Sequence, residues 1–136
     1  MNENTPENVP SERELQILKI LWKSGPLSVR DVCDELNRLE NSELAYTSVL
    51  TLLQIMERKG FADHEQAGRS YRYFARVKKS RIVGGLTEKF LAHVFDGAMD
   101  EMLVSLIGSQ KVSSEEIEKL EKLLRESRAS GIGHRE

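Results

Sequence analysis

The sequence contains a single cysteine, Cys33, only three prolines and no long apolar run. One cysteine excludes an internal disulfide framework and any multi-cysteine zinc or iron–sulfur cage, so we expect a reducing compartment, the cytoplasm. No stretch is apolar for long enough to cross a bilayer, and residues 1–10 carry no basic or apolar targeting segment, so we expect no membrane insertion. Residues 1–10 are polar and hold two of the prolines, which predicts a flexible N-terminal arm.

The charged residues are unevenly distributed along the chain. The formal net charge is −2, yet the segment from Arg58 to Arg81 holds eight basic residues against two acidic ones, a net +6. A basic segment on an acidic background favours attraction to phosphate. Charge runs are often plain solvated surface, so this segment alone does not establish a binding site. With 136 residues and 39% hydrophobic composition, the chain can bury roughly two-thirds of its unfolded surface in one or two small units.

Two short helices are expected before residue 40. Ser11 and Glu14 have the spacing of a capping box, which predicts a helix start, and the Gly25-Pro26 turn ends that helix. Ser28 then starts a second helix. Cys33 stands at helical spacing with apolar residues, so we predict that its side chain is buried in the core and is not a nucleophile. The apolar residues at helical spacing are Leu15, Leu18, Ile20, Leu21, Trp22, Val29, Val32, Cys33 and Leu36.

Residues 45–60 are predicted to form a third helix with two unlike faces. Gly60 ends this helix, because glycine takes the left-handed conformation at a C-terminal cap without cost. The expected core face comprises Val49, Leu50, Leu52, Leu53 and Met56. The opposite face comprises hydrogen-bonding and basic residues: Thr47, Thr51, Gln54, Arg58 and Lys59. Such residues are suited to contacts with base edges and phosphates. A polar helix face can also be simply solvated.

A β-hairpin is predicted directly after this helix. Residues 61–65 and 70–75 are strand-like, and residues 66–69 form a short loop that includes a glycine. Three short helices followed by a hairpin are typical of a winged helix-turn-helix module, in which the hairpin is the wing. Arg69 at the tip and Arg72 on the flank are then placed to meet the minor groove or its phosphates.

The last third of the sequence predicts helices that cannot cover their own apolar residues. One stripe runs along residues 82–94, a second along residues 99–107, and Ser113 with Glu116 forms another capping box before a last helix. Gly84 and Gly85 interrupt the first stripe, which suggests close backbone packing or a hinge. Three helices this apolar and this short are more plausible as half of an interface between chains than as a complete domain.

Several of these segments together resemble the penicillinase repressor (BlaI/MecI/CopY) family of bacterial transcription regulators. The motifs are the LWKSGPLSV turn, the YTSVLTLL helix and the GRSYRY wing, and the resemblance extends over residues 11–128. It implies a homodimer whose N-terminal winged helix binds a palindromic operator and whose C-terminal helices form the dimer. By position, it also implies groove-facing roles for Tyr46, Thr47, Ser48 and Thr51, and wing roles for Arg69 and Tyr71.

We therefore predict a mainly α protein with a winged helix-turn-helix of three helices and a two-stranded wing, followed by a helical dimerisation domain. The expected divisions are a flexible arm (1–10), the DNA-binding domain (11–77), the dimerisation domain (78–128) and a flexible tail (129–136). The predicted operator DNA contacts are Tyr46, Thr47, Ser48, Thr51, Gln54, Arg58 and Lys59 from the helix, and Arg69, Tyr71 and Arg72 from the wing. The predicted dimer contacts are Ile82, Leu86, Phe90, Val94, Met102, Leu106, Leu120 and Leu124.

The resemblance implies two routes by which such a repressor is released from DNA. Some members of the family that this chain resembles are cut by a membrane-bound sensor protease, and others bind copper through C-terminal cysteines. The second route lacks support because the sole cysteine lies in the DNA-binding half. Residues 103–107 replace the Asn-Phe pair of cleaved members and could be a cleavage site or core, and their helical spacing favours core.

Other functional classes receive less support from the sequence. His64, His93 and His134 show no triad or metal-ligand spacing, so neither an enzyme nor a bound metal or cofactor is expected. The alternative function is a winged helix that docks onto protein through its basic wing without sequence-specific DNA binding. Salt distinguishes the two, because binding to DNA weakens steeply as salt rises whereas an apolar protein interface changes little.

Overall fold

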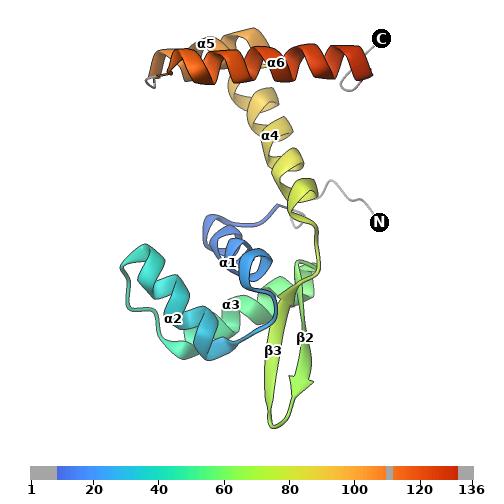
Figure 1. Ribbon diagram of the computed structural model, residues 1–136. Helices are drawn as coiled ribbons and strands as arrows, with labels where there is room; N and C mark the ends of the chain where they lie inside the picture. The colour runs from blue at the N-terminus through green and yellow to red at the C-terminus, as the bar shows by residue number, and fades with distance from the viewer. Residues whose placement is uncertain (1–8, 110–111, 132–136) are drawn as a thin grey trace. The chain divides into compact units, whose positions relative to one another are not determined.

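The computed structural model describes residues 9–109 and 112–131 (Figure 1). In chain order, the described residues form α1 (Glu12–Ser24), β1 (Leu27–Ser28), α2 (Val29–Glu40), α3 (Tyr46–Lys59), β2 (Ala62–Ala67), β3 (Ser70–Ala75), α4 (Lys79–Phe95), α5 (Met99–Ser109) and α6 (Ser114–Ser130). The chain divides into two compact units, Met1–Lys89 and Phe90–Glu136, so the division falls within α4.

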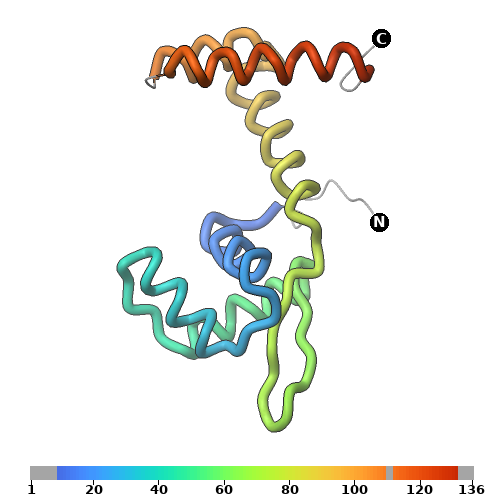
Figure 2. The backbone as a smooth tube through the Cα atoms, viewed as in Figure 1, coloured from blue at the N-terminus to red at the C-terminus, as the bar shows by residue number. Residues whose placement is uncertain are grey.

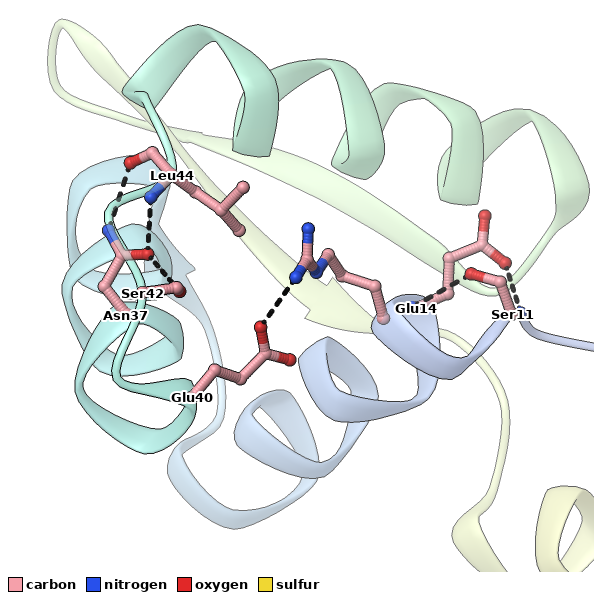
Figure 3. Close-up of polar contacts among 7 residues, drawn as sticks. Ser11, Glu14, Asn37, Glu40, Ser42 and Leu44 are labelled. Atoms are coloured by element: carbon pink, nitrogen blue, oxygen red, sulfur yellow. Dashed lines mark hydrogen bonds and ion pairs between the residues drawn. The ribbon is translucent and has the colours of Figure 1, made fainter.

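Helix α1 begins at the predicted capping box. The Ser11 hydroxyl accepts a hydrogen bond from the Glu14 backbone N–H at 3.2 Å, and the Glu14 carboxylate accepts one from the Ser11 N–H at 2.9 Å (Figure 3). Gly25, with φ of 76°, ends the helix and donates its N–H to the Leu21 carbonyl. Pro10 is buried, so the last residue of the predicted arm already packs on the first unit, while residues 1–8 lie outside the described residues.

The sheet contains one strand more than the sequence predicted. The two residues of β1 pair antiparallel with β3, Leu27 opposite Tyr73, and the strand order is β1-β3-β2. A two-residue strand shows no alternation of its own, which is why the pattern missed it. The predicted four-residue loop is also too long, since β2 and β3 pair up to Ala67 and Ser70 and leave a two-residue turn. Gly68 occupies the first turn position with φ of 67°, where a side chain would be strained.

The core of the first unit joins all three of its N-terminal helices to the hairpin. Val49, Leu53 and Met56 of α3 are fully buried, as predicted, and so is Ile17, which the predicted stripe of α1 omitted. Cys33 is a free, buried thiol, as predicted. Trp22 donates its indole N–H to the Val77 carbonyl at 2.9 Å, which ties α1 to the segment that leads into α4. The hairpin tip projects beyond the three helices (Figure 2).

The start of α4 belongs to this core rather than to a separate domain. Ile82 is 7% exposed within the core cluster, and Leu86 is partly buried against it. Ile82 is thus covered by the winged-helix core and Leu86 is partly covered by it, so we do not carry these two residues into the proposed dimer interface. Apart from their chain neighbours and their own helix backbone, no described atom lies within 4 Å of a Cβ built at Gly84 or Gly85, so the described residues do not show the expected close backbone packing.

The second unit consists of the end of α4 together with α5 and α6. Asp96 and Gly97 take positive φ values after α4, and Ser113 with Glu116 forms the predicted capping box at α6. No residue of α5 or α6, all of which are described, is buried, so the preference for core at residues 103–107 fails within a single chain. Helix α6 continues to Ser130 and Gly131 caps it, so part of the predicted tail is helical, while residues 132–136 are outside the described range. Among the described helices, none is long and apolar enough to span a membrane.

Candidate nucleic-acid interface

Helix α3 has the two faces that the sequence predicted. Its inner face is held by Val49, Leu53 and Met56, each with 0% exposure. The residues predicted to face a groove are exposed on the other side: Tyr46, Thr47, Ser48, Thr51, Gln54 and Arg58. Since the buried residues recur at helical spacing, the exposed set is held to one side of a rigid element rather than to a loop.

The start of α3 is fixed by Asn37, a residue that the sequence analysis did not single out. Its side-chain amide donates to the Leu44 carbonyl at 3.0 Å, and its oxygen accepts from the Leu44 N–H and the Ser42 hydroxyl, both at 2.9 Å (Figure 3). Asn41, with φ of 52°, ends α2 in the left-handed conformation that asparagine tolerates. These contacts set the turn between α2 and α3, and therefore the direction in which α3 leaves it.

Arg30 adds a positive charge beside the first residue of α3. It lies in the first turn of α2, is exposed, and places its guanidinium 5.3 Å from the centroid of the Tyr46 ring. A cation over an aromatic face is attracted by the ring quadrupole. The pair therefore holds an arginine and a tyrosine together at the edge of the exposed face. A contact between helices of this kind has no signal in the sequence, since the two residues are separated by a turn.

Thr51 uses its hydroxyl proton within the helix. Its hydroxyl donates to the Thr47 carbonyl at 2.9 Å, one turn earlier. This common arrangement leaves the oxygen lone pairs and the methyl group facing outward. The exposed groups of Thr51 are thus a hydrogen-bond acceptor and an apolar methyl, which is a narrower set than the sequence alone implied.

Lys59 has a structural role that the sequence analysis did not predict. Its ammonium lies 3.0 and 3.2 Å from the two carboxylate oxygens of Glu14, which is 2% exposed. A buried carboxylate requires a partner of this kind, so Lys59 is committed to the fold. We therefore propose that Lys59 is not a phosphate contact, while Arg58, the other member of the basic pair, is exposed.

The wing presents its basic and aromatic residues on both sides of β3. Arg69 at the turn and Arg72 on β3 are exposed, and Tyr71 is 52% exposed. Tyr73 is buried, and this burial raises the pKa of its phenol, with the Glu57 carboxylate adding to the shift. The buried Tyr73 anchors β3 to the core, which leaves Arg69, Tyr71 and Arg72 projecting from an anchored strand.

His64 lies against the wing and α3 together. Its ring is edge-on to Tyr71 at 4.9 Å and tilted to Tyr73 at 5.3 Å, measured between ring centroids. Its Nδ1 is 2.7 Å from a carboxylate oxygen of Glu57, and Asp63 completes a group of three potential metal ligands. The sequence showed no such group, because Glu57 reaches the other two only when α3 and β2 are adjacent.

Three helices, a small sheet and an exposed polar helix face next to a basic hairpin define a winged helix-turn-helix protein. The sequence matches the family model of the penicillinase repressor over residues 10–126. The chain belongs to the penicillinase repressor family, as its resemblance predicted. Its class of function is that of the family, transcriptional repression.

Individual relatives agree with this assignment. The chain is 31% identical over 124 residues to the transcriptional regulator BlaI of Mycobacterium tuberculosis, covering 90% of this chain and 86% of that protein. It is 26% identical over 116 residues to the penicillinase repressor of Bacillus licheniformis, covering 85% and 89%. A MarR family protein from Bacillus stearothermophilus shares the fold, with a TM-score of 0.53 and 22% identity over 93% of this chain and 76% of that one.

Proposed function

We propose that this protein is a dimeric, cytoplasmic repressor that binds a pseudo-palindromic operator. The observation that carries the proposal is the exposed polar face of α3, which is held by a buried apolar face and stands beside a basic wing. An α-helix fits the major groove of B-DNA, and polar side chains at its exposed positions can reach base edges.

The base contacts are assigned to the N-terminal half of α3. Thr47, Ser48 and Thr51 are exposed there, with Gln54 one turn further along. The Thr47 and Ser48 hydroxyls can bond either to donors or to acceptors on the bases, while Thr51 offers an acceptor oxygen and a methyl group that can contact a thymine methyl. Tyr46 at the helix start completes this set, with its ring held by Arg30.

The phosphate contacts are assigned to basic residues that surround this face. Arg58 near the end of α3 and Arg69 and Arg72 on the wing are exposed. Arg30, next to Tyr46, is added to them, and Tyr71 offers a phenol on the wing. Contacts with phosphate supply affinity and orientation but little sequence information, and they weaken as salt rises.

The dimer is assigned to the second unit of the chain. Phe90, Val94 and Leu124 are each more than half exposed, which is unusual for such large apolar side chains. A second copy of the same chain is the simplest partner, because a twofold axis brings equal apolar surfaces together and matches an operator with two half-sites. The proposed contacts are Phe90, Val94, Met102, Leu106, Leu120 and Leu124.

Release from the operator by a membrane-bound sensor protease is part of the proposal. Residues 103–107 of α5 are all exposed in the single chain. A cut there would separate α6 from the rest of the second unit and remove part of the proposed dimer surface. A protein without a dimer loses the second half-site and hence most of its operator affinity.

Nuclease footprinting on the DNA upstream of the protein's own gene tests the proposal. We expect two protected half-sites of inverted sequence, with centres about 34 to 36 Å or a multiple of this spacing apart along the helix axis. Protection of a single site, or none at protein concentrations that saturate random DNA, would contradict a dimeric repressor.

A further inference from the structure

We propose that Glu57, Asp63 and His64 form a binding site for a divalent transition-metal ion of the zinc class, between the end of α3 and the start of β2. These three residues offer one ligand atom each, and all three atoms lie within 4.8 Å of one another. They come from two different elements, so an ion bound there would link the helix directly to the wing.

The separations are close to those that coordination requires. The His64 Nδ1 is 2.7 Å from Glu57 Oε1 and 4.0 Å from Asp63 Oδ1. Ligands at about 2.0–2.2 Å from a zinc ion in tetrahedral geometry stand roughly 3.3–3.6 Å apart. Because the three side chains are partly exposed, we expect their rotation to bring the ligand atoms to these separations.

The imidazole is oriented for this role by its neighbours. Tyr71 contacts the His64 ring edge-on and Tyr73 contacts it at a tilt, on the strand that pairs with β2. Asp63 is held as well, because its Oδ1 accepts the His64 backbone N–H at 2.8 Å. Packing and hydrogen bonds of this kind limit the range of orientations that the ligand side chains can take.

The ligand types select among metals. One imidazole nitrogen with two carboxylates suits zinc, cobalt or nickel, whereas magnesium and calcium prefer oxygen ligands alone. The side chains of His64 and Glu57 are 35% and 32% exposed, so water can supply the remaining positions. Three protein ligands and an open position describe an accessible site rather than a closed structural one.

Arg76 places a positive charge beside the carboxylate of Asp63. Its guanidinium lies 3.8 Å from Asp63 Oδ2, and its side chain is 63% exposed. A pair this exposed and this long contributes little and can separate at small cost. A bound dication would instead neutralise both carboxylates, which lie between α3 and the wing. If the protein binds DNA as proposed above, on which this consequence rests, the bound ion would also remove the repulsion between these carboxylates and the DNA phosphates.

Calorimetric titration of the purified full-length protein with zinc chloride tests the site without any DNA. We expect saturable binding of one ion per chain, and visible absorption bands on titration with cobalt chloride. Either His64→Ala or Glu57→Gln should weaken binding by at least about tenfold. The matched control is His93→Ala, which removes an exposed histidine of α4 and should leave zinc binding unchanged.

Two results would overturn the proposal. One is the absence of saturable binding at millimolar zinc, and the other is binding that persists in both His64→Ala and Glu57→Gln. Glu57→Gln preserves side-chain shape, so it remains informative even if the histidine variant folds poorly. Zinc should also tighten DNA binding by the original protein but not by the His64→Ala variant. Calorimetry decides the site itself even if no DNA binding is found.

Discussion

The ammonium of Lys59, the last residue of α3, contacts the carboxylate of Glu14 in the first turn of α1, at 3.0 and 3.2 Å. The same carboxylate caps α1 by accepting the Ser11 N–H. Glu14 is 2% exposed, so both contacts satisfy a charge that water does not reach. One carboxylate thus joins the beginning of the first helix to the end of the helix that we assign to the major groove.

Replacing Lys59 with methionine should destabilise the protein while leaving its phosphate contacts intact. The change leaves Glu14 buried without its cation, and we expect a loss of about 2–3 kcal/mol, somewhat below the range for a fully buried pair. Urea unfolding followed by the fluorescence of Trp22, the single tryptophan, measures this loss. Lys19→Met, on the exposed side of α1, is the control. A Lys59→Met protein with unchanged stability but a reduced salt dependence of DNA binding would return Lys59 to the phosphate contacts.

Replacing Asn37 with alanine should loosen the turn that precedes α3. The change removes four side-chain hydrogen bonds, one of them a weak bond to the Cys33 sulfur. It leaves the Leu44 N–H without a partner and the Leu44 carbonyl with only the Cys33 thiol, at an expected cost of about 2–3 kcal/mol. Operator affinity should fall as well, because α3 would no longer be held in one direction. Asn37→Asp keeps both hydrogen bonds that the side-chain oxygen accepts. Its stability should lie between that of the original protein and that of Asn37→Ala. Equal stability of all three would show that the turn does not depend on this side chain.

The two halves of the α4 stripe should respond differently to substitution. Ile82→Ala opens a cavity in the winged-helix core and should cost about 2–4 kcal/mol. Phe90→Asp changes an exposed side chain and should leave that core stable, yet dissociate the proposed dimer, because it places a charge in the proposed apolar interface. Thermal unfolding and analytical ultracentrifugation separate the two effects. Dissociation caused by Ile82→Ala without loss of stability would restore Ile82 to the dimer interface.

Base and phosphate contacts should be separable within the proposed interface. Thr51→Ala should cost roughly 1–3 kcal/mol on the operator and little on random DNA, since it removes a contact with a base. Arg69→Ala should weaken binding to both DNAs and lower the slope of affinity against salt by about one. Fluorescence anisotropy with labelled duplexes measures both quantities. Equal losses on the two DNAs for Thr51→Ala would exclude that residue from base readout.

Features set by neighbours in sequence were predictable, and those set by distant partners were not. The capping boxes at Ser11 and Ser113 and the glycine cap at Gly60 follow from a few adjacent residues, and all three are confirmed. In contrast, β1 exists only through its pairing with β3, more than forty positions later. Helix spacing indicated that Ile82 is buried, but it could not show that the cover is the chain's own core.

In the candidate site too, features set within one helix were predictable and contacts between elements were not. The exposed face of α3 follows from periodicity within one helix, and its exposure is confirmed residue by residue. The commitment of Lys59 to Glu14, the stacking of Arg30 on Tyr46 and the meeting of Glu57 with His64 each join different elements. Such contacts depend on how the elements pack, and periodicity within one element carries no information about packing between elements.

The most direct test of the account is binding of the purified protein to the DNA upstream of its own gene, titrated against salt and against random DNA. The account predicts tight binding that prefers the upstream fragment and weakens steeply as salt rises. Binding to both DNAs without preference, by a protein that ultracentrifugation shows to be an intact dimer, would contradict it and favour a winged helix that docks onto protein.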